Sequence, residues 1–359
     1  VLANAFFPLP PLAEQHRIVA KVDELMDLCD QLEAARQQRE QCRERLVAAS
    51  LQRLNQPSED PEAFRSDARF ALQVLPSLTS TPAQIKQLRQ TILNLAVRGK
   101  LVEQDPEDEP AEELLRRVGL EIKAYSAINR SPYGAESKIR LSNEAPFAAP
   151  KGWAWARLCS LFRVVTDGDH QPPPKSNDGI AFLTIGNITG GKVVFDSCRF
   201  VPETYFRSLA AYRVPEKGDI LYSVVGATYG RASIVDTNRP FCVQRHIAIL
   251  KPAKELDAGY LLLLLRSSLI YDQATKSLTG TAQPTIALKP LRSFHAPLPP
   301  LAEQHRIVAK VDELMALCDQ LEQQLSQAEQ GRRGLLEAVL REALVGRLPE
   351  RPEERHAAL

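Results

Sequence analysis

Residues 8–33 read PLPPLAEQHRIVAKVDELMDLCDQLE, and residues 297–322 read PLPPLAEQHRIVAKVDELMALCDQLE. The two stretches differ at one position only, where Asp27 is replaced by Ala316, so they form an internal repeat with a constant offset of 289 residues. In each copy the opening prolines end an extended segment and preset the backbone for the helix that follows. The chain therefore carries two near-identical helices with a large, different segment between them.

Apolar residues recur in each copy at alternating steps of four and three, which is the spacing of a coiled-coil seam. These residues are Ile18, Val22, Leu25, Cys29 and Leu32 in the first copy, and Ile307, Val311, Leu314, Cys318 and Leu321 in the second. Such a stripe predicts an interface with a partner helix or a partner subunit. His16 and His305 occupy the same position in the two copies, which favours an interface role over a metal-binding or catalytic one.

The overall pattern predicts an α+β fold, in which one β-rich α+β domain is flanked by long α-helical, coiled-coil spacers. In chain order we expect the remnant of a last strand (1–7), a first conserved helix (8–56), a linker with at most one short helix (57–82), a second helix with a further linker (83–148), the β-rich domain (149–296), a second conserved helix (297–345) and a tail (346–359). By the repeat offset, residues 1–7 take the place of a domain's last strand. This suggests either a piece of a longer protein or a half-length version of one.

The β-rich domain is predicted from short β-branched and aromatic runs separated by Gly, Pro and Asp. Examples are DILYSVVGA at residues 219–227 and HIAILKP at residues 246–252. Helical pieces are expected at Ala258–Ser268 and Ile270–Ser277.

Charge is almost balanced over the 359 residues, with 45 Lys and Arg against 44 Asp and Glu. The balance hides an asymmetry, because residues 151–296 contain 18 basic and 11 acidic residues, a net charge of +7, which leaves −6 for the remainder. A basic domain between acidic helices is what contact with phosphates would require. The six cysteines have no CxxC spacing, and no apolar run is long enough to span a bilayer. We therefore expect a cytoplasmic protein with no membrane partner.

The sequence offers little for catalysis. It contains no GxxxxGK[ST] phosphate loop, no GxGxxG, and no [DNS]PP[YF] motif of amino-methyltransferases, which HQPPP at residues 170–174 does not satisfy. Asp167, Asp169 and His170 could form a metal or acid/base cluster, but TDGDHQPPP reads more simply as a turn. We predict no catalytic residue and no metal site.

Polar loops of the central domain suit base reading better. Arg can bind guanine with two hydrogen bonds, Gln can bind adenine in the same way, and Ser or Thr can bond to either base. The candidates for DNA binding are Asp169, His170, Gln171, Lys175, Thr228, Tyr229, Arg231, Gln244, Arg245, His246, Thr279, Thr281 and Gln283. Each residue alone could equally be a solvated loop position. Tyr222, Phe182 and Trp153 are expected in the core.

Several motifs in a fixed order carry a resemblance to a known family. They are GWAWARL, TDGDHQPP, FLTIGNITGGKV, KGDILYSVVGATYGRASIV, QRHIAILKP, GTAQPTIALKPL and PLPPLAEQHRIVAKVDEL, all within residues 149–330, with LRQTILNLAVRGKLV at residues 88–102. Together they resemble the specificity subunit of Type I restriction-modification enzymes. The chain departs from the family plan, because it has one recognition domain where that plan has two.

The resemblance implies a non-catalytic subunit that binds double-stranded DNA and reads half of a bipartite, interrupted site. It implies partners as well: methyltransferase subunits docked on the helices and, through them, restriction/translocase subunits. S-adenosylmethionine, ATP and Mg would be used by those partners, and no cofactor is expected in this chain. Two half-length chains could pair head to tail as a homodimer and restore the two-domain plan.

An alternative from a different class remains open. The chain could be a coiled-coil scaffold or decoy that binds methyltransferase subunits without reading DNA. Sequence preference in a binding assay would separate the two hypotheses.

Overall fold

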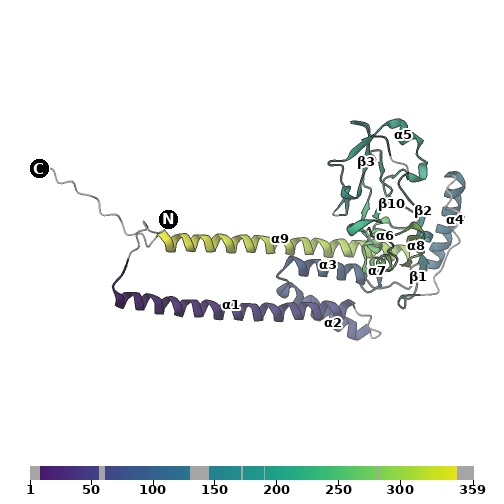
Figure 1. Cartoon of the computed structure of the whole chain (residues 1–359). Coiled ribbons are helices and arrows are strands. Elements are labelled where there is room, and N and C mark those ends of the chain that lie inside the picture. The colour runs from purple at the N-terminus through teal and green to yellow at the C-terminus, as the bar shows by residue number, and fades with distance from the viewer. Residues whose placement is uncertain are drawn as a thin grey trace. The chain divides into compact units, whose positions relative to one another are not determined.

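The computed structural model describes residues 9–55, 61–129, 145–170, 173–189, 191–280 and 283–345 (Figure 1). The chain divides into two compact units, Val1–Gln84 and Ile85–Leu359. The predicted strand remnant at residues 1–7 and the tail at 346–359 lie outside the described residues.

The first unit consists of a long helix α1 (Leu12–Asn55) and a second helix α2 (Pro61–Leu78) packed on its C-terminal end. Val47, Leu51 and Leu54 of α1 are buried together with Ala71 of α2. Residues 57–82 were expected to form a linker with one short helix; a helix is present, but α2 has 18 residues and fills most of the segment. Its apolar residues recur at helical spacing and give it a face to bury, and its two prolines, Pro61 and Pro76, obscure that pattern.

The second unit begins with two helices, α3 (Pro82–Val97) and α4 (Ala111–Asn129). Its strands are β1 (Ala154–Arg157), β2 (Phe162–Asp167), β3 (Ile180–Leu183), β4 (Ile188–Thr189), β5 (Lys192–Val193), β6 (Arg199–Val201), β7 (Ile220–Ser223), β8 (Ala232–Ile234), β9 (Phe241–Val243), β10 (Ile247–Pro252) and β11 (His295–Leu298). Helices α5 (Glu203–Ser208), α6 (Ala258–Arg266), α7 (Ser268–Lys276), α8 (Leu288–Ser293) and α9 (Leu301–Val345) complete it, with short 3-10 turns between.

The centre of this unit is a four-stranded sheet in the order β2-β10-β7-β8, in which all neighbours are antiparallel. A three-stranded sheet, β6-β3-β9, lies beside it, and β1 pairs with β11. Both faces of the four-stranded sheet are buried, which explains why β10 is apolar from Ile247 to Leu250. Ala248 and Leu250 belong to the core shared with the helices, whereas Ile247 and Ile249 belong to a second core shared with β3 and β9. Alternate residues of one strand thus fill two cores.

Helices cover the first of these faces. α4 and α8 contact β2, and α6 contacts both β8 and α9. The mixed helix-and-sheet architecture, with a long C-terminal helix, agrees with the predicted α+β class. The predicted boundary at residue 297 shifts slightly, because Pro297 and Leu298 still pair with β1 and α9 begins only at Leu301.

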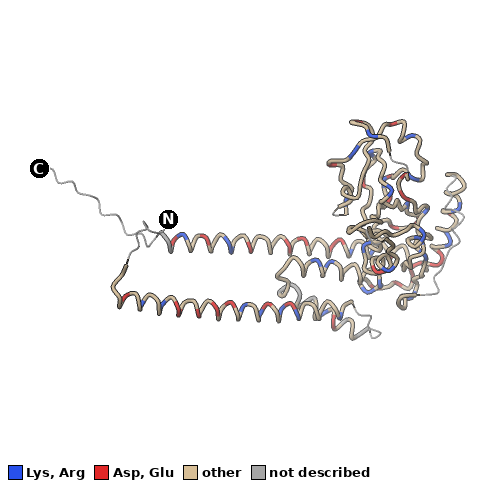
Figure 2. The backbone as a smooth tube through the Cα atoms, viewed as in Figure 1, with Lys and Arg blue, Asp and Glu red and all other residues tan. Residues whose placement is uncertain are grey.

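The two repeat copies begin their helices in the same way. The Gln15 side chain donates to the Pro10 carbonyl at 2.7 Å, and its equivalent Gln304 donates to the Pro299 carbonyl at 3.0 Å. Each bond ties the first turn to the proline segment, so the local structure follows the sequence. Blue and red residues are interspersed along both α1 and α9 (Figure 2). Among the described residues, no helix has the length and apolarity needed to cross a bilayer.

Candidate nucleic-acid interface

The loops predicted to read DNA leave from one end of the four-stranded sheet. The pairings Ala248 with Asp167, Ile247 with Ser223, and Tyr222 with Ala232 place the ends of β2 and β7 beside the starts of β10 and β8. The segments that follow β2, precede β10 and join β7 to β8 are therefore neighbours in space. They carry three of the four predicted groups of residues.

The fourth predicted loop joins them through backbone hydrogen bonds. Gly226 donates to the Pro284 carbonyl at 2.9 Å, and Ile286 donates to the Val224 carbonyl at 2.8 Å. Within this loop, Thr279 and Thr285 exchange backbone bonds of 3.0 and 2.9 Å. The antiparallel sheet thus collects loops that lie more than a hundred residues apart in the sequence.

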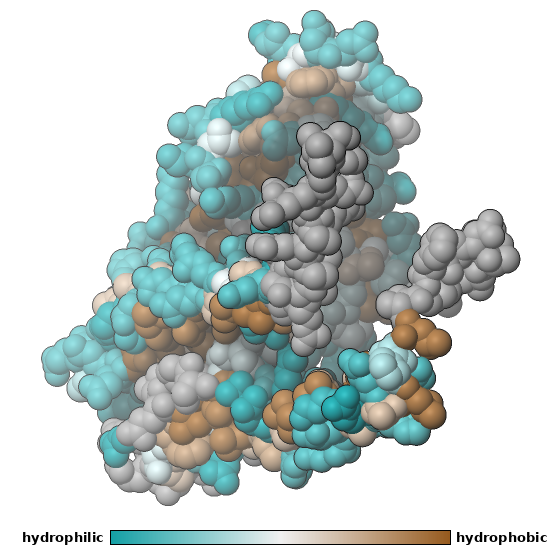
Figure 3. Space-filling view, turned by 90° about the vertical axis from the view of Figure 1, so that its left-hand side faces the viewer, coloured by the Kyte–Doolittle hydropathy of each residue, from teal (hydrophilic) through white to brown (hydrophobic). Residues whose placement is uncertain are grey.

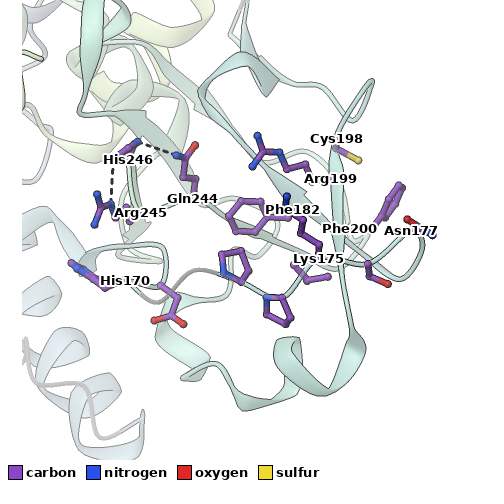
Figure 4. A pocket seen from close by; sticks show the side chains of 15 residues that line it. His170, Lys175, Asn177, Phe182, Cys198, Arg199, Phe200, Gln244, Arg245 and His246 are labelled. Atoms are coloured by element: carbon purple, nitrogen blue, oxygen red, sulfur yellow. Dashed lines mark hydrogen bonds between the residues drawn. The ribbon is translucent and has the colours of Figure 1, made fainter.

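Two of the loops line a cleft of about 860 Å³ (Figure 4). Asp169, His170 and Lys175 come from the loop after β2, and Gln244, Arg245 and His246 come from the segment before β10. The remaining lining includes Phe182 of β3 and Arg199 and Phe200 of β6. Arg199 was not among the predicted residues, because the run KVVFDSCRFV at residues 192–201 indicates a strand and no binding site. A basic residue within such a run was the signal that could have identified it.

Gly168 allows the first loop to approach the second closely. A Cβ atom at this position would lie 2.1 Å from the Val243 carbonyl oxygen and 2.7 Å from the carbonyl carbon of Gln244. The next residue, Asp169, forms a parallel bridge with Gln244. Any residue other than glycine would clash at this position, so the close packing of the two loops requires Gly168.

Asp169 is already engaged by neighbouring side chains. The Tyr205 hydroxyl donates to its Oδ2 at 3.2 Å, and the Arg213 guanidinium lies 3.9 Å from its Oδ1. Arg213 also donates to the Gly168 carbonyl at 3.0 Å. Burial, followed by the Asp169 charge, raises the pKa of Tyr205 well above its usual value, so this hydroxyl keeps its proton and remains a donor. Tyr205 and Arg213 are thus supporting residues that the sequence did not reveal.

The histidines of the cleft differ in environment. His170 is exposed and its Nε2 lies 3.1 Å from an Asp167 carboxylate oxygen. His246 is partly buried, with its Nδ1 3.0 Å from Gln244 Nε2, and Arg245 Nε donates to its Nε2 at 3.3 Å. Burial, and then the Arg245 charge, lowers the pKa of His246, so its imidazole is neutral near pH 7. Both ring nitrogens face protein side chains, so His246 links Gln244 and Arg245.

The β7–β8 loop carries an aromatic pair. Tyr229 stacks on Tyr271 of α7 with ring centroids 5.2 Å apart and an interplanar angle of 8°, and its hydroxyl lies 2.9 Å from Thr275 Oγ1. Arg231 is exposed and lines a smaller hollow of about 400 Å³ that also includes Arg266. Contacts of Tyr229 with α7 therefore hold the loop in place, and Arg231 remains exposed to solvent.

The predicted DNA-binding residues are consequently described as two adjoining groups. The cleft holds Asp169, His170, Lys175, Gln244, Arg245 and His246, while Thr228, Tyr229, Arg231, Thr279 and Gln283 belong to the loops linked through Val224–Gly226. Gln171 and Thr281 lie outside the described residues. Tyr222, Phe182 and Trp153 are buried, as expected for core residues. Among the residues that the structure describes, no group of three or more His, Cys, Asp or Glu is arranged to hold a metal ion.

The predicted helix-interface residues have different surroundings in the two copies. In α9, Ile307 is 0% exposed, and Val311 and Cys318 are each 1% exposed. They belong to the core of the second unit, where α9 contacts α6 and where Arg89 of α3 forms ion pairs with α9, so helices of the same chain pack against the seam there. In α1 the equivalent Ile18 and Val22 are 48% and 50% exposed. Leu25 and Leu32 of α1 are also largely exposed, and Cys29 is exposed as well, whereas Leu314 and Leu321 of α9 are partly buried.

Polar residues add to the attachment of α9. Glu303 is buried and accepts a hydrogen bond from Trp153 Nε1 at 2.9 Å and one from Gln104 at 3.1 Å. Arg306 forms an ion pair with Asp108 at 2.5 Å. Their counterparts in α1, Glu14 and Arg17, are exposed.

The hydropathy of the surface is uneven. In the space-filling view, mostly hydrophilic side chains cover the visible face of the part that holds β3 and α5, with smaller hydrophobic areas between them (Figure 3).

Comparison with known proteins gives consistent matches. A family model described as "Type I restriction modification DNA specificity domain" matches residues 150–329. The Type I restriction enzyme EcoAI specificity subunit of Escherichia coli is 30% identical over 344 residues, which cover 94% of this chain and 57% of that protein. The EcoEI specificity subunit of Escherichia coli is 32% identical over 355 residues, which cover 95% of this chain and 59% of that protein. This chain thus spans less than two thirds of the length of either relative.

Among solved structures, the HsdS subunit from Thermoanaerobacter tengcongensis matches with 23% sequence identity and a TM-score of 0.42. The match covers 73% of this chain and 59% of that chain.

Proposed function

This chain belongs to the family of Type I restriction-modification DNA specificity domains, and on that premise we propose that it binds double-stranded DNA and reads half of a bipartite, interrupted site. The observation that carries the proposal is the convergence of four polar loops at one end of the four-stranded sheet. These loops present Arg, Gln and Thr side chains, which are groups that distinguish base edges in a groove.

The reader of the half-site is the second unit, and Gln244 and Arg245 are its central side chains. Gln244 is held beside His246, and Arg245 is exposed at the rim of the cleft. Replacing Arg245 with Ala should cost about 1–3 kcal/mol of binding at one base-pair position and relax specificity at that position. Arg207→Ala is the matched control, because Arg207 is an exposed arginine on α5 that pairs with Glu203 and lies outside the cleft lining.

The test is methylome sequencing of cells that carry the partner methyltransferase, with and without this chain. A bipartite adenine motif should appear only with the chain, and Arg245→Ala should degrade one position of it. A gel-shift assay on duplexes of random sequence provides a second test, which measures whether the complex prefers any sequence. Complex formation without any sequence preference would instead identify the chain as a scaffold or decoy.

We also propose that the chemistry resides in partners. The family resemblance assigns methyl transfer to subunits that use S-adenosylmethionine, and DNA translocation to subunits that use ATP and Mg. The exposed apolar side chains along α1 support a docking role for that helix, because a stripe of apolar residues at coiled-coil spacing is a favourable helix-binding surface. Ile18→Asp combined with Val22→Asp should abolish association with the methyltransferase.

Pairing of two chains is a further part of the proposal. A second copy would supply a second reading unit, and the half-sites would then lie about one helical turn apart, ~34 Å. The mass of the chain in solution, alone and with its methyltransferase, measures this directly. A complex that holds a single copy of this chain would exclude the pairing.

A further inference from the structure

The cleft beside the reading loops has a shape and a charge that base reading alone does not explain. Groove edges are read by side chains that protrude into the groove, whereas Gln244 and Arg245 stand on the wall of a hollow of about 860 Å³. A hollow receives a part of the ligand that projects. The projecting part of duplex DNA is its sugar–phosphate backbone.

The rim of the cleft carries uncompensated positive charge. Lys175, Arg199 and Arg245 line it and are all exposed, and within the described part of the chain no carboxylate lies within 4.0 Å of their charged nitrogens. Many exposed basic residues elsewhere are paired, such as Arg207 with Glu203 and Arg117 with Glu109. Cations left unpaired around a hollow are free to bind phosphate oxygens.

The acidic residue of the lining does not cancel this charge. Asp169 accepts the Tyr205 hydrogen bond and faces the Arg213 guanidinium at 3.9 Å, so its charge is largely balanced from its own side. With Asp169 counted at −1, the lining Lys175, Arg199 and Arg245 still leave a net charge of +2. The cleft therefore favours an anion.

The floor of the cleft is apolar. Phe182 and Val201 are 6% and 1% exposed, and Pro173 and Pro174 also line the cleft. A cationic rim over an apolar floor matches a deoxyribose with its two flanking phosphates, because the sugar ring offers carbon atoms and the phosphates offer charge.

We propose that this cleft holds one sugar–phosphate strand of the bound duplex, with Arg199 and Lys175 as the phosphate-binding residues. Holding the backbone there orients the segment Gln244–His246 on the opposite wall toward the adjacent base edges. Arg199 and Lys175 are thus positioning residues, which set register and affinity without reading sequence. The inference rests on the proposed function and assigns a separate task to each wall of the same cleft.

The test measures binding of the complex formed with the methyltransferase to the methylated motif and to its single-base variants, by fluorescence anisotropy at several salt concentrations. Arg199→Gln should weaken binding to every duplex by the same factor. It should also lower the salt slope by about 0.9, so that the variant loses about 3.5-fold less affinity than the wild type between 50 and 200 mM salt. Lys175→Gln should act in the same way, because Ser176, the next residue, pairs with Phe200 beside Arg199. Arg239→Gln is the control, because Arg239 is exposed but lies over the Phe195 ring, outside the cleft lining.

A methylphosphonate scan locates the contact. Replacing one phosphate of the half-site with an uncharged methylphosphonate should weaken wild-type binding at one or two positions and have no further effect on Arg199→Gln. A change of base preference in Arg199→Gln, an unchanged salt slope in both variants, or tighter binding to a duplex with a bulged nucleotide would each overturn the proposal. Wild-type protein without any sequence preference would instead overturn the proposed function, so the two failures are distinguishable.

Discussion

The internal repeat allows one residue to be tested in two environments with the same neighbours in sequence. Ile18 and Ile307 are equivalent positions of the repeat, yet Ile18 is 48% exposed and Ile307 is 0% exposed. We predict that Ile307→Ala lowers the free energy of unfolding of the second unit by about 3 kcal/mol, within the usual range of about 2–5 for a buried isoleucine. Ile18→Ala should change stability by no more than about 0.5 kcal/mol.

The local terms cancel in this comparison. Helix propensity and side-chain contacts within one turn are the same in the two copies, because residues 8–26 and 297–315 are identical. The difference between the two variants therefore reports the burial of the side chain by residues distant in sequence. In a melting experiment, ~3 kcal/mol corresponds to a shift of about 6–12 °C for a unit of this size.

Urea denaturation followed by circular dichroism, at several protein concentrations, measures both variants. Val311→Ala and Val22→Ala are a second pair with the same contrast, since Val311 is 1% and Val22 is 50% exposed. Equal losses in the two copies would refute the reasoning. A loss at Ile18 that grows with protein concentration would show that association covers α1 in solution.

Two further predictions concern buried and partly buried charges. Lys251 and Asp219 form a 2.7 Å ion pair with side chains 0% and 2% exposed, so Asp219→Ala should cost about 3–5 kcal/mol by leaving the ammonium group buried without its main partner. Glu216→Ala is the control, because Glu216 is 62% exposed and its loss should cost at most about 1 kcal/mol in the same denaturation assay. The second prediction concerns His246, whose pKa is lowered by burial and by Arg245, so that the unfolded chain binds this proton more readily than the folded one. Stability should therefore rise with pH up to about 6.5 and then level off, and His246→Gln should reduce this slope; a steeper slope in the variant would contradict the assignment.

Much of the fold could be predicted from local pattern. The long helices, the strands of DILYSVVGA and HIAILKP, and the helices near Ala258 and Ile270 all lie where periodicity and composition placed them. β2 (Phe162–Asp167) and β9 (Phe241–Val243) were not predicted. They have six and three residues, and strands this short next to turns show too little alternation of apolar and polar residues to be recognised. Residues 61–78 form helix α2 where a linker with one short helix was expected. This helix packs on the C-terminal end of α1, and the local sequence pattern does not reveal that contact.

The candidate site divides in the same way. The residue types of Gln244, Arg245 and His246 were enough to indicate an interface, because their side chains carry the donors and acceptors that base edges require. Arg199, Tyr205 and Arg213 were missed, since each belongs to another part of the chain. Strand pairing and packing bring Arg199 to the cleft and bring Tyr205 and Arg213 to the loop that carries Asp169. Sheet register decided which loops meet.

The two repeat copies show most directly which features local sequence determines and which depend on tertiary structure. Its sequence alone determined that residues 12–33 and 301–322 are helical and begin with the same glutamine-to-proline hydrogen bond, because helix formation depends on neighbours within about one turn. Only the tertiary structure decided that Ile307 and Glu303 are buried while Ile18 and Glu14 are exposed. Burial depends on the surface that distant parts of the chain bring against a helix, and identical sequences carry no information about that surface.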